Sequence, residues 1–214
     1  MERESVSPPL KEHNKKIVVV GSINMDETIS VGRLPMEGET MIARGVTLLP
    51  GGKGANQALQ CARLGAEVTM VGCVGDDLFG QQLLEPLREA GMDVSHVVVR
   101  KGIHSGVGHV VLEVTEHSAQ NRIVVIPGAN RTLTVEEVAW IQQAVSGFDM
   151  VLLQLEVPIE VNRAVARWAR EAGVPVIADI KRGDIAKTAE MYAMGHFTGD
   201  FESDFVTLAP YMGL

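Results

Sequence analysis

Polar side chains follow the first hydrophobic run of the sequence at a spacing suited to a ligand with several hydroxyl groups. The run at residues 17–20 is β-branched and predicts a strand buried on both faces. Asn24 and Asp26 come shortly after it, and open α/β sheets place ligands beyond the carboxyl ends of their strands. A carboxylate there accepts hydrogen bonds from two neighbouring hydroxyl groups. The pair indicates a sugar site or, taken alone, a turn or a helix cap.

A glycine-rich turn supplies a second group of candidates. Residues 51–54 read Gly-Gly-Lys-Gly and precede a helical pattern that begins at Asn56. Glycines let the backbone come close to a ligand, and their N–H groups can donate to hydroxyls. A phosphate-binding P-loop does not fit, because position 47 is threonine and Lys53 is followed by glycine instead of Ser or Thr. Taken alone, these glycines would be turn formers.

A third group lies near the end of the chain, where Asp179 and Asp184 flank Lys181. In an extended segment, residues two apart point to the same side, so Asp179 and Lys181 are expected to lie together. Carboxylates beside a lysine keep it protonated and positioned as a proton donor. The alternative is structural: Asp184 caps the helix that follows, and Lys181 forms a surface ion pair.

Strand and helix patterns alternate along the chain and predict an α/β fold with a mainly parallel sheet. Each predicted helix is ten or so residues long and is closed by glycine or opened by a capping residue. The predicted strands are residues 16–20, 68–74, 109–115, 122–126, 150–155, 176–178 and 205–208, and the predicted helices are residues 56–64, 77–90, 134–146, 158–172 and 185–194.

The composition is that of a folded globular protein. Of 214 residues, 46% are hydrophobic and 21% charged, which argues against disorder. The formal net charge is −8, so neither a nucleic acid nor a membrane is an expected partner. Cys61 and Cys73 cannot form a disulfide framework, which favours a cytoplasmic protein. Residues 1–15 form a polar leader without a signal-peptide pattern.

Several segments, in this order, resemble the front half of the ribokinase-like, PfkB-type carbohydrate kinases. The resemblance covers about residues 16–175 and rests on the segments at residues 21–26, 51–58, 75–77, 128–130 and 154–158. It implies ATP- and Mg²⁺-dependent phosphorylation of a pentose such as ribose. The pentose-binding groups would be Asn24, Asp26, Gly52, Lys53, Asn56 and Glu156.

The same resemblance implies a small β-sheet lid at about residues 28–48 and 104–126. In this family the lid closes over the sugar and often mediates dimerisation, so a homodimer is one expectation. The second family signature, Asp-x-x-Gly-Ala-Gly-Asp, does not occur in the chain. Its aspartate is the base that deprotonates the sugar, and the ATP-binding region belongs to the same half. We therefore expect a truncated kinase fold, inactive alone, without a catalytic base or a metal ligand.

Residues 179–213 are similar to orotidine 5′-phosphate decarboxylase, whose hallmark is Asp-x-Lys-x-x-Asp-Ile. This resemblance implies that Lys181 protonates the carbon that loses CO₂, that Asp179 crowds the leaving carboxylate, and that Asp184 reaches a neighbouring subunit. No cofactor is needed. Residues 176–214 would then be a βαβ piece of a TIM barrel, joined near residues 173–178 to the kinase-like part at 16–175. A third hypothesis is a non-catalytic sugar-binding remnant.

Overall fold

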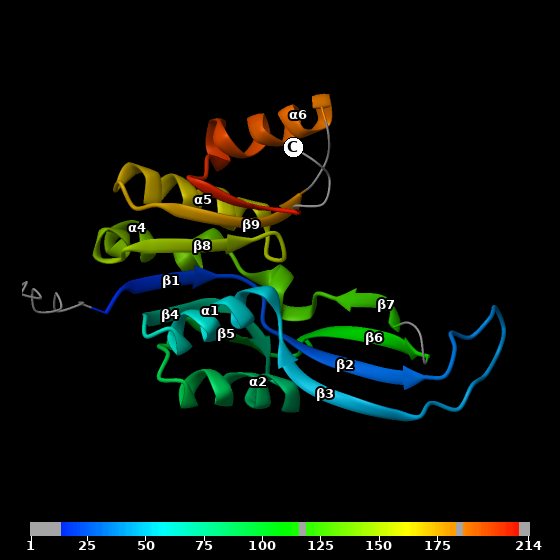
Figure 1. The fold of residues 1–214 in the computed structure, drawn as a ribbon. Helices are drawn as coiled ribbons and strands as arrows, with labels where there is room; N and C mark the ends of the chain where they lie inside the picture. Colours follow the sequence, from blue (N-terminus) through cyan, green and yellow to red (C-terminus); the bar gives the residue numbers. More distant parts are fainter. Residues whose placement is uncertain (1–13, 116–118, 183–185, 210–214) are drawn as a thin grey trace, which may run out of the picture.

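The fold consists of a large sheet flanked by helices and a smaller sheet that extends to one side (Figure 1). The structure is a computed structural model, and it describes residues 14–115, 119–182 and 186–209. Most of the expected polar leader and Asp184 lie outside these ranges.

The large sheet has six strands in the order β10-β9-β8-β1-β4-β5, and every neighbouring pair is parallel. In the central strand β1, Val18, Val19 and Val20 are fully buried because helices cover both faces of the sheet, as the β-branched run predicts. All carboxyl ends therefore meet at one edge. The strands are β1 (Lys16–Val20), β4 (Glu67–Gly75), β5 (Val97–Arg100), β8 (Met150–Gln154), β9 (Val176–Arg182) and β10 (Phe205–Leu208).

Helices cover the large sheet on both faces. On one face lie α1 (Lys53–Arg63) and α2 (Leu78–Glu89), and on the other lie α3 (Val135–Val138), α4 (Ile141–Ala144) and α5 (Ile159–Glu171). The single helix expected at 134–146 is two short helices, the first of which begins with a capping box formed by Thr134 and Glu137. Helix α6 (Ala186–Phe197) follows β9, and η1 (Gly128–Thr132), η2 (Val145–Gly147) and η3 (Gly199–Phe201) are 3₁₀ turns. No helix within the described ranges is long and apolar enough to cross a membrane.

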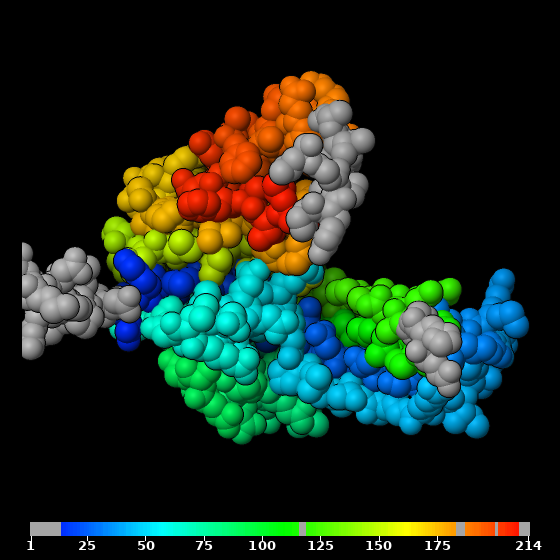
Figure 2. Space-filling view, viewed as in Figure 1, coloured from blue at the N-terminus to red at the C-terminus, as the bar shows by residue number. Residues whose placement is uncertain are grey.

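The smaller sheet is formed by the segments in which the family resemblance places a lid. Its order is β3-β2-β6-β7, with β2 and β6 parallel and the two outer strands antiparallel to them. Figure 2 shows it standing out from the body, with α1 between it and the C-terminal segment. Its strands are β2 (Asn24–Val31), β3 (Gly45–Gly51), β6 (Gly106–Val114) and β7 (Ala119–Ile126).

The C-terminal segment extends the large sheet, and this corrects the expectation of a TIM-barrel piece at 176–214. Strand β9 pairs with β8, with Ala178 opposite Leu153, and β10 pairs in parallel with β9. A barrel must close on itself, whereas the described strands form an open sheet with β10 at its edge. The βαβ unit is present, but it belongs to the same sheet as β1.

Candidate functional site

Five of the six sequence-predicted sugar-binding residues come together at the carboxyl edge of the large sheet, beside the small sheet. Asn24 begins β2 and lies opposite Gly51 in β3, so Asp26 is two residues further out on the same face. Gly52 precedes α1, Lys53 begins it, and Glu156 follows β8. Asn56 lies one turn into α1, is exposed, and donates no side-chain hydrogen bond to a described residue.

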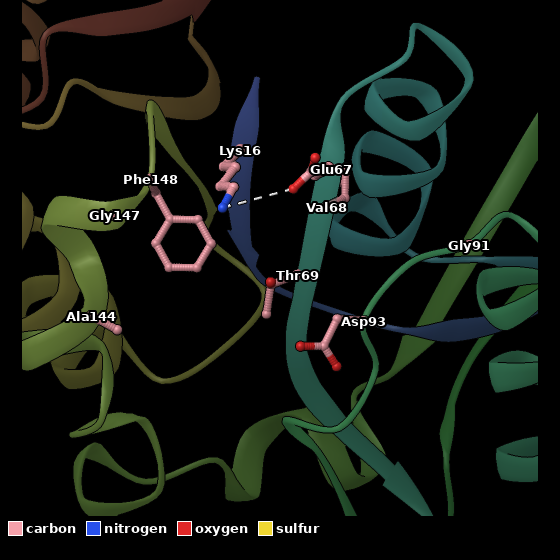
Figure 3. A pocket seen from close by; sticks show the side chains of 9 residues that line it. All are labelled: Lys16, Glu67, Val68, Thr69, Gly91, Asp93, Ala144, Gly147 and Phe148. Carbon is pink, nitrogen blue, oxygen red and sulfur yellow. Dashed lines mark ion pairs between the residues drawn. The ribbon is translucent and has the colours of Figure 1, made fainter. Parts of the chain in front are cut away.

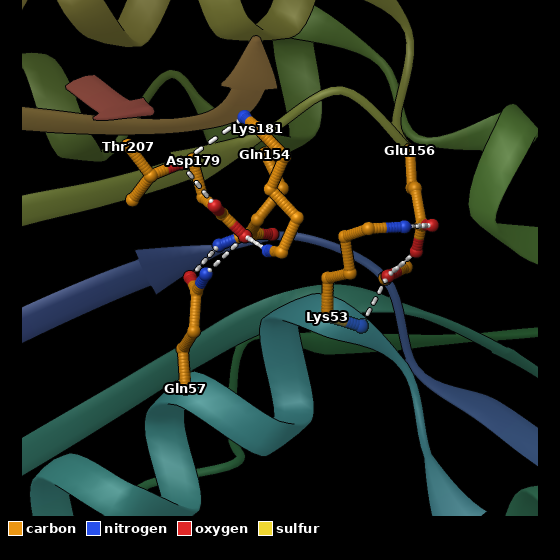
Figure 4. A network of polar contacts seen from close by, with 8 residues as sticks. Lys53, Gln57, Gln154, Glu156, Asp179, Lys181 and Thr207 are labelled. Carbon is orange, nitrogen blue, oxygen red and sulfur yellow. Dashed lines mark hydrogen bonds and ion pairs between the residues drawn. The ribbon is translucent and has the colours of Figure 1, made fainter. Parts of the chain in front are cut away.

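An ion pair between Lys53 and Glu156 forms one wall of the site (Figure 4). Ser22, which is fully buried, donates its hydroxyl proton to Glu156 and accepts the backbone N–H of Lys53 at 3.1 Å. Burial by itself would raise the pKa of Glu156, but the hydrogen bonds from Lys53 and Ser22 outweigh it and lower that pKa. Glu156 is therefore ionised and holds the lysine in place.

Asp26 lies in a narrow slot between two glycines. A Cβ on Gly51 would be 2.1 Å from Asp26 Oδ2, and a Cβ on Gly108 would be 2.7 Å from Oδ1, so only glycine leaves room for the carboxylate. No described residue donates a hydrogen bond to it. Burial raises the pKa of Asp26, and the charge of Glu156 raises it further, while Lys53 opposes both. The site thus holds a carboxylate whose acceptor positions are open to a ligand.

Asp179 is the centre of a second polar cluster beside Lys53 (Figure 4). Its buried carboxylate accepts hydrogen bonds from Gln57 Nε2 at 2.8 Å, from Thr207 and from Lys181. Gln154 at the end of β8 donates to Gln57 Oε1 at 2.6 Å. Burial would raise the pKa of Asp179, but the hydrogen bonds from Lys181 and Thr207 and the charges of Lys181 and Lys53 lower it. The cluster joins α1 to β8, β9 and β10.

Several residues of both clusters were not predicted from the sequence. They are polar side chains of ordinary type whose partners lie far away in the chain: Ser22, Gln57, Gln154 and Thr207. Gln57 and Gln154 stand in two of the segments on which the family resemblance rests, which was their only signal in the sequence. Asp184, the third predicted residue of the C-terminal group, lies outside the described residues.

A hollow of about 520 Å³ lies at the opposite edge of the large sheet, by the amino ends of β1 and β4 (Figure 3). Lys16, Glu67, Asp93 and Phe148 are among the residues that line it, and none of the predicted site residues does. Within the described ranges, no three His, Cys, Asp or Glu side chains gather as metal ligands would. The carboxyl edge remains the candidate site.

Comparison with known proteins identifies the family. A model of the pfkB family carbohydrate kinases matches residues 14–196, which include every described element up to α6. The chain belongs to this family. It is 37% identical to the ribokinase of Bacillus subtilis (strain 168) over 163 residues, covering 76% of this chain and 54% of that protein. The ribokinase of Arabidopsis thaliana is 38% identical over 169 residues, covering 78% of this chain and 44% of that protein.

Solved structures agree with the fold. The Arabidopsis thaliana ribokinase complexed with ribose and ATP superposes with a TM-score of 0.67 at 34% identity, covering 81% of this chain and 54% of that one. The ribokinase of Cryptococcus neoformans var. grubii in complex with ADP gives a TM-score of 0.62 at 29% identity, covering 78% and 50%. The fold is thus ribokinase-like, and the chain spans about half the length of the curated relatives it matches.

The decarboxylase interpretation finds no support in these results. The family match continues past residue 175 through β9 and into α6, and β9 and β10 extend the kinase sheet. Asp179 and Lys181 do lie in contact, as their spacing predicts. Their observed partners, Gln57 in α1 and Thr207 in β10, give them a role in joining this helix and the edge strand to β9.

Proposed function

We propose that this chain binds a pentose such as ribose at the carboxyl edge of its large sheet, as the sugar-binding half of an ATP-dependent sugar kinase. The observation that carries the proposal is the Asp26 carboxylate, which accepts no hydrogen bond from a described residue and is held in a glycine slot opposite the Lys53–Glu156 pair. The ribokinases that match 76% and 81% of this chain support the proposal.

Each site residue has a distinct part in the proposed site. Asp26 accepts hydrogen bonds from two sugar hydroxyls, and the backbone at Gly52, whose φ is 93°, comes close enough to donate to another. Lys53, oriented by Glu156, donates from the opposite wall. Asn24 contacts the sugar from the base of β2, and Asn56 contacts it from the rim. The small sheet would act as the lid.

ATP, with Mg²⁺, would supply the phosphoryl group that a kinase transfers to the sugar. The ribokinase structures solved with ATP or ADP support the nucleotide as a ligand of the family. The 214 residues contain no Gly-Ala-Gly-Asp segment, so we assign no base and no metal ligand to the residues of this chain. We propose that the 214-residue polypeptide alone binds the sugar without transferring phosphate.

Calorimetric titration with ribose tests this proposal. Replacing Asp26 with Asn leaves sugar hydroxyls without a charged acceptor, which costs ~1.5–3 kcal/mol, or about tenfold or more in affinity. Asp93→Asn, at the opposite edge of the sheet, is the matched control and should bind as the parent does. Equal ribose affinity of the parent and Asp26→Asn would contradict the site. Sugar-dependent ADP release that Asp26→Asn abolishes would contradict the absence of transfer.

A further inference from the structure

Asn130 is a buried side chain whose orientation is fixed by backbone groups. It lies in η1 and is 1% exposed. Its Oδ1 accepts the backbone N–H of Ile23 at 2.9 Å, and a backbone N–H can only donate. Its Nδ2 lies 3.2 Å from the carbonyl oxygen of Ile23 and 3.0 Å from that of Pro127, which can only accept, and it shares its two protons among these two oxygens and the side chain of Asn24. The amide of Asn130 therefore has one allowed orientation.

This orientation determines that of Asn24. Asn130 Nδ2 also lies 2.7 Å from the side chain of Asn24, and because this nitrogen donates, Asn24 must turn its Oδ1 toward it. The Nδ2 of Asn24 is then left as the free end of that amide, and it donates to no described residue. Asn24 thus presents a donor beside the open acceptor of Asp26.

The surrounding structure holds this pair of amides in place. A Cβ on Gly106, opposite Asn24 in β6, would lie 2.1 Å from Asn24 Oδ1 and 2.3 Å from Asn130 Nδ2, so the contact requires glycine there. The η1 turn is fixed by Arg100, which donates to the hydroxyl of Thr132 at 2.7 Å and to both carboxylate oxygens of Glu137. The turn that carries Asn130 has little freedom to move.

We infer that Asn130 is a positioning residue that makes Asn24 a hydrogen-bond donor to the ligand. In the bound sugar, the hydroxyl that faces Asn24 then accepts a hydrogen bond, and the hydroxyls that face Asp26 donate hydrogen bonds. This inference rests on the proposed function for the identity of the ligand. The polarity of Asn24 itself follows from the backbone groups around Asn130.

Side-chain amide NMR of the ¹⁵N-labelled 214-residue chain tests the inference. The Asn24 signal is assigned as the one missing from Asn24→Asp. Without ribose, the Asn130 amide protons should exchange slowly with solvent, and those of Asn24 should exchange faster. With ribose, the Asn24 signal should shift in proportion to binding. Ribose binding without a shift of that signal, or Asn24 protons as protected as those of Asn130, would overturn the inference.

Asn130→Asp reverses the polarity, because a carboxylate cannot donate to Asn24 and the Asn24 amide must turn round. We expect at least a tenfold loss of ribose affinity and no response of the Asn24 signal to ribose. Asn121→Asp, an exposed position in β7, adds the same charge and should bind as the parent does. Unchanged affinity of a folded Asn130→Asp would contradict the inference.

Gly106→Ala separates the two amides without changing charge, and it replaces Asn130→Asp if that variant does not fold. It should also lose at least tenfold in affinity, with faster exchange of the Asn130 amide protons. If neither variant folds, the exchange and shift of the parent's Asn24 amide decide. A parent that does not bind ribose contradicts the proposed function, while its amide exchange still tests the polarity.

Discussion

At the residue scale, the ionised carboxylate of Asp26 favours ribose binding but lowers the stability of the fold. Its pKa is raised in the folded chain by burial and by Glu156, so the ionised carboxylate destabilises the fold at neutral pH. Asp26→Asn fits the same glycine slot and removes this charge. We expect the variant to melt at a higher temperature than the parent at pH 7.

The sign of this effect can be checked by changing the pH. A carboxyl whose pKa is higher in the folded chain than in the unfolded chain binds protons more tightly when folded, so its unfavourable contribution disappears as pH falls. The difference in melting temperature between Asp26→Asn and the parent should therefore shrink as pH falls through the raised pKa of Asp26, and it should be gone below the ordinary pKa of an aspartate. A difference that grows as pH falls would contradict the raised pKa.

The affinity for ribose should depend on the same protonation of Asp26, but protonation should weaken binding although it stabilises the fold. Protonation removes acceptor capacity from Asp26, and Glu156, whose pKa is lowered, remains ionised over that range. We expect affinity to fall as pH drops through the raised pKa of Asp26, which lies above the usual value for aspartate. Titrations of Asp26→Asn over the same range supply the control, because its weaker binding should not change with this group.

The chemically distinctive residues of the site could be predicted from the sequence, whereas their supporting residues could not. Asn24, Asp26 and Lys53 stand beside a buried run or a glycine turn. Ser22 and Glu156 are 134 residues apart, and nothing in the local sequence of Ser22 indicates that they meet. Pairings of this kind depend on strand order, which places β8 next to β1.

At the scale of elements, α1 is fastened to the end of β8 by two polar contacts. Lys53 and Gln57, one turn apart on α1, meet Glu156 and Gln154, and Gln57 also donates to Asp179. Helix residues four apart lie on one face, so a single face of α1 makes these contacts. The position of the glycine turn before α1 therefore depends on β8 and β9.

Asp179→Ala should weaken this junction. It leaves the half-buried donors of Gln57 and Thr207 without their acceptor, and a donor shielded from water and left unpaired costs up to ~1–3 kcal/mol of unfolding free energy. Lys181 is exposed, so Lys181→Ala removes a largely solvated ion pair and should cost no more than ~1 kcal/mol. Urea unfolding of the two variants measures both costs. A larger loss for Lys181→Ala would contradict the central role of Asp179.

The small sheet exposes apolar side chains on both faces, and we expect it to pair with a second copy of the chain. Val46 and Val124 are 61% and 64% exposed. Val46 is level with Ile29, and Val124 is level with Glu27 across β6. Residues 27 and 29 of β2 point to the opposite face from Asp26, so both valines lie on the face away from the site. Large exposed apolar patches mark association surfaces. The parent should sediment as a dimer and the double variant Val46→Lys, Val124→Lys as a monomer; a monomeric parent would contradict this expectation.

Most strands of the large sheet could be predicted, because buried parallel strands read as apolar runs. Strand β5 was missed because it has four residues and three of them are exposed or partly so. Strand β2 mixes polar and apolar residues, and β3 is a short apolar stretch that is exposed at every residue except Gly51, because both faces of the small sheet are accessible. Strands β2 and β3 of the lid were therefore predicted only through the family resemblance, whereas the pattern-predicted strands at residues 109–115 and 122–126 overlap β6 and β7.

At the scale of the whole molecule, the site lies where three parts of the chain meet. The large sheet provides the end of β8, the small sheet provides Asn24 and Asp26, and α1 lies between them (Figure 2). The sequence predicted alternating strands and helices but not their order in space. That order places residues beyond 175 in the same sheet as β1, where a local change of pattern had indicated a separate piece.

The most direct test of the account is a map of the backbone amide shifts that ribose causes in the ¹⁵N-labelled 214-residue chain. We predict shifts that saturate with ribose at Asn24, Gly52 and Glu156 and at their neighbours at the carboxyl edge. The opposite edge, at Lys16 and Asp93, should not respond. Shifts confined to that opposite edge, or no shifts at millimolar ribose, would contradict the claim that the carboxyl edge binds a pentose.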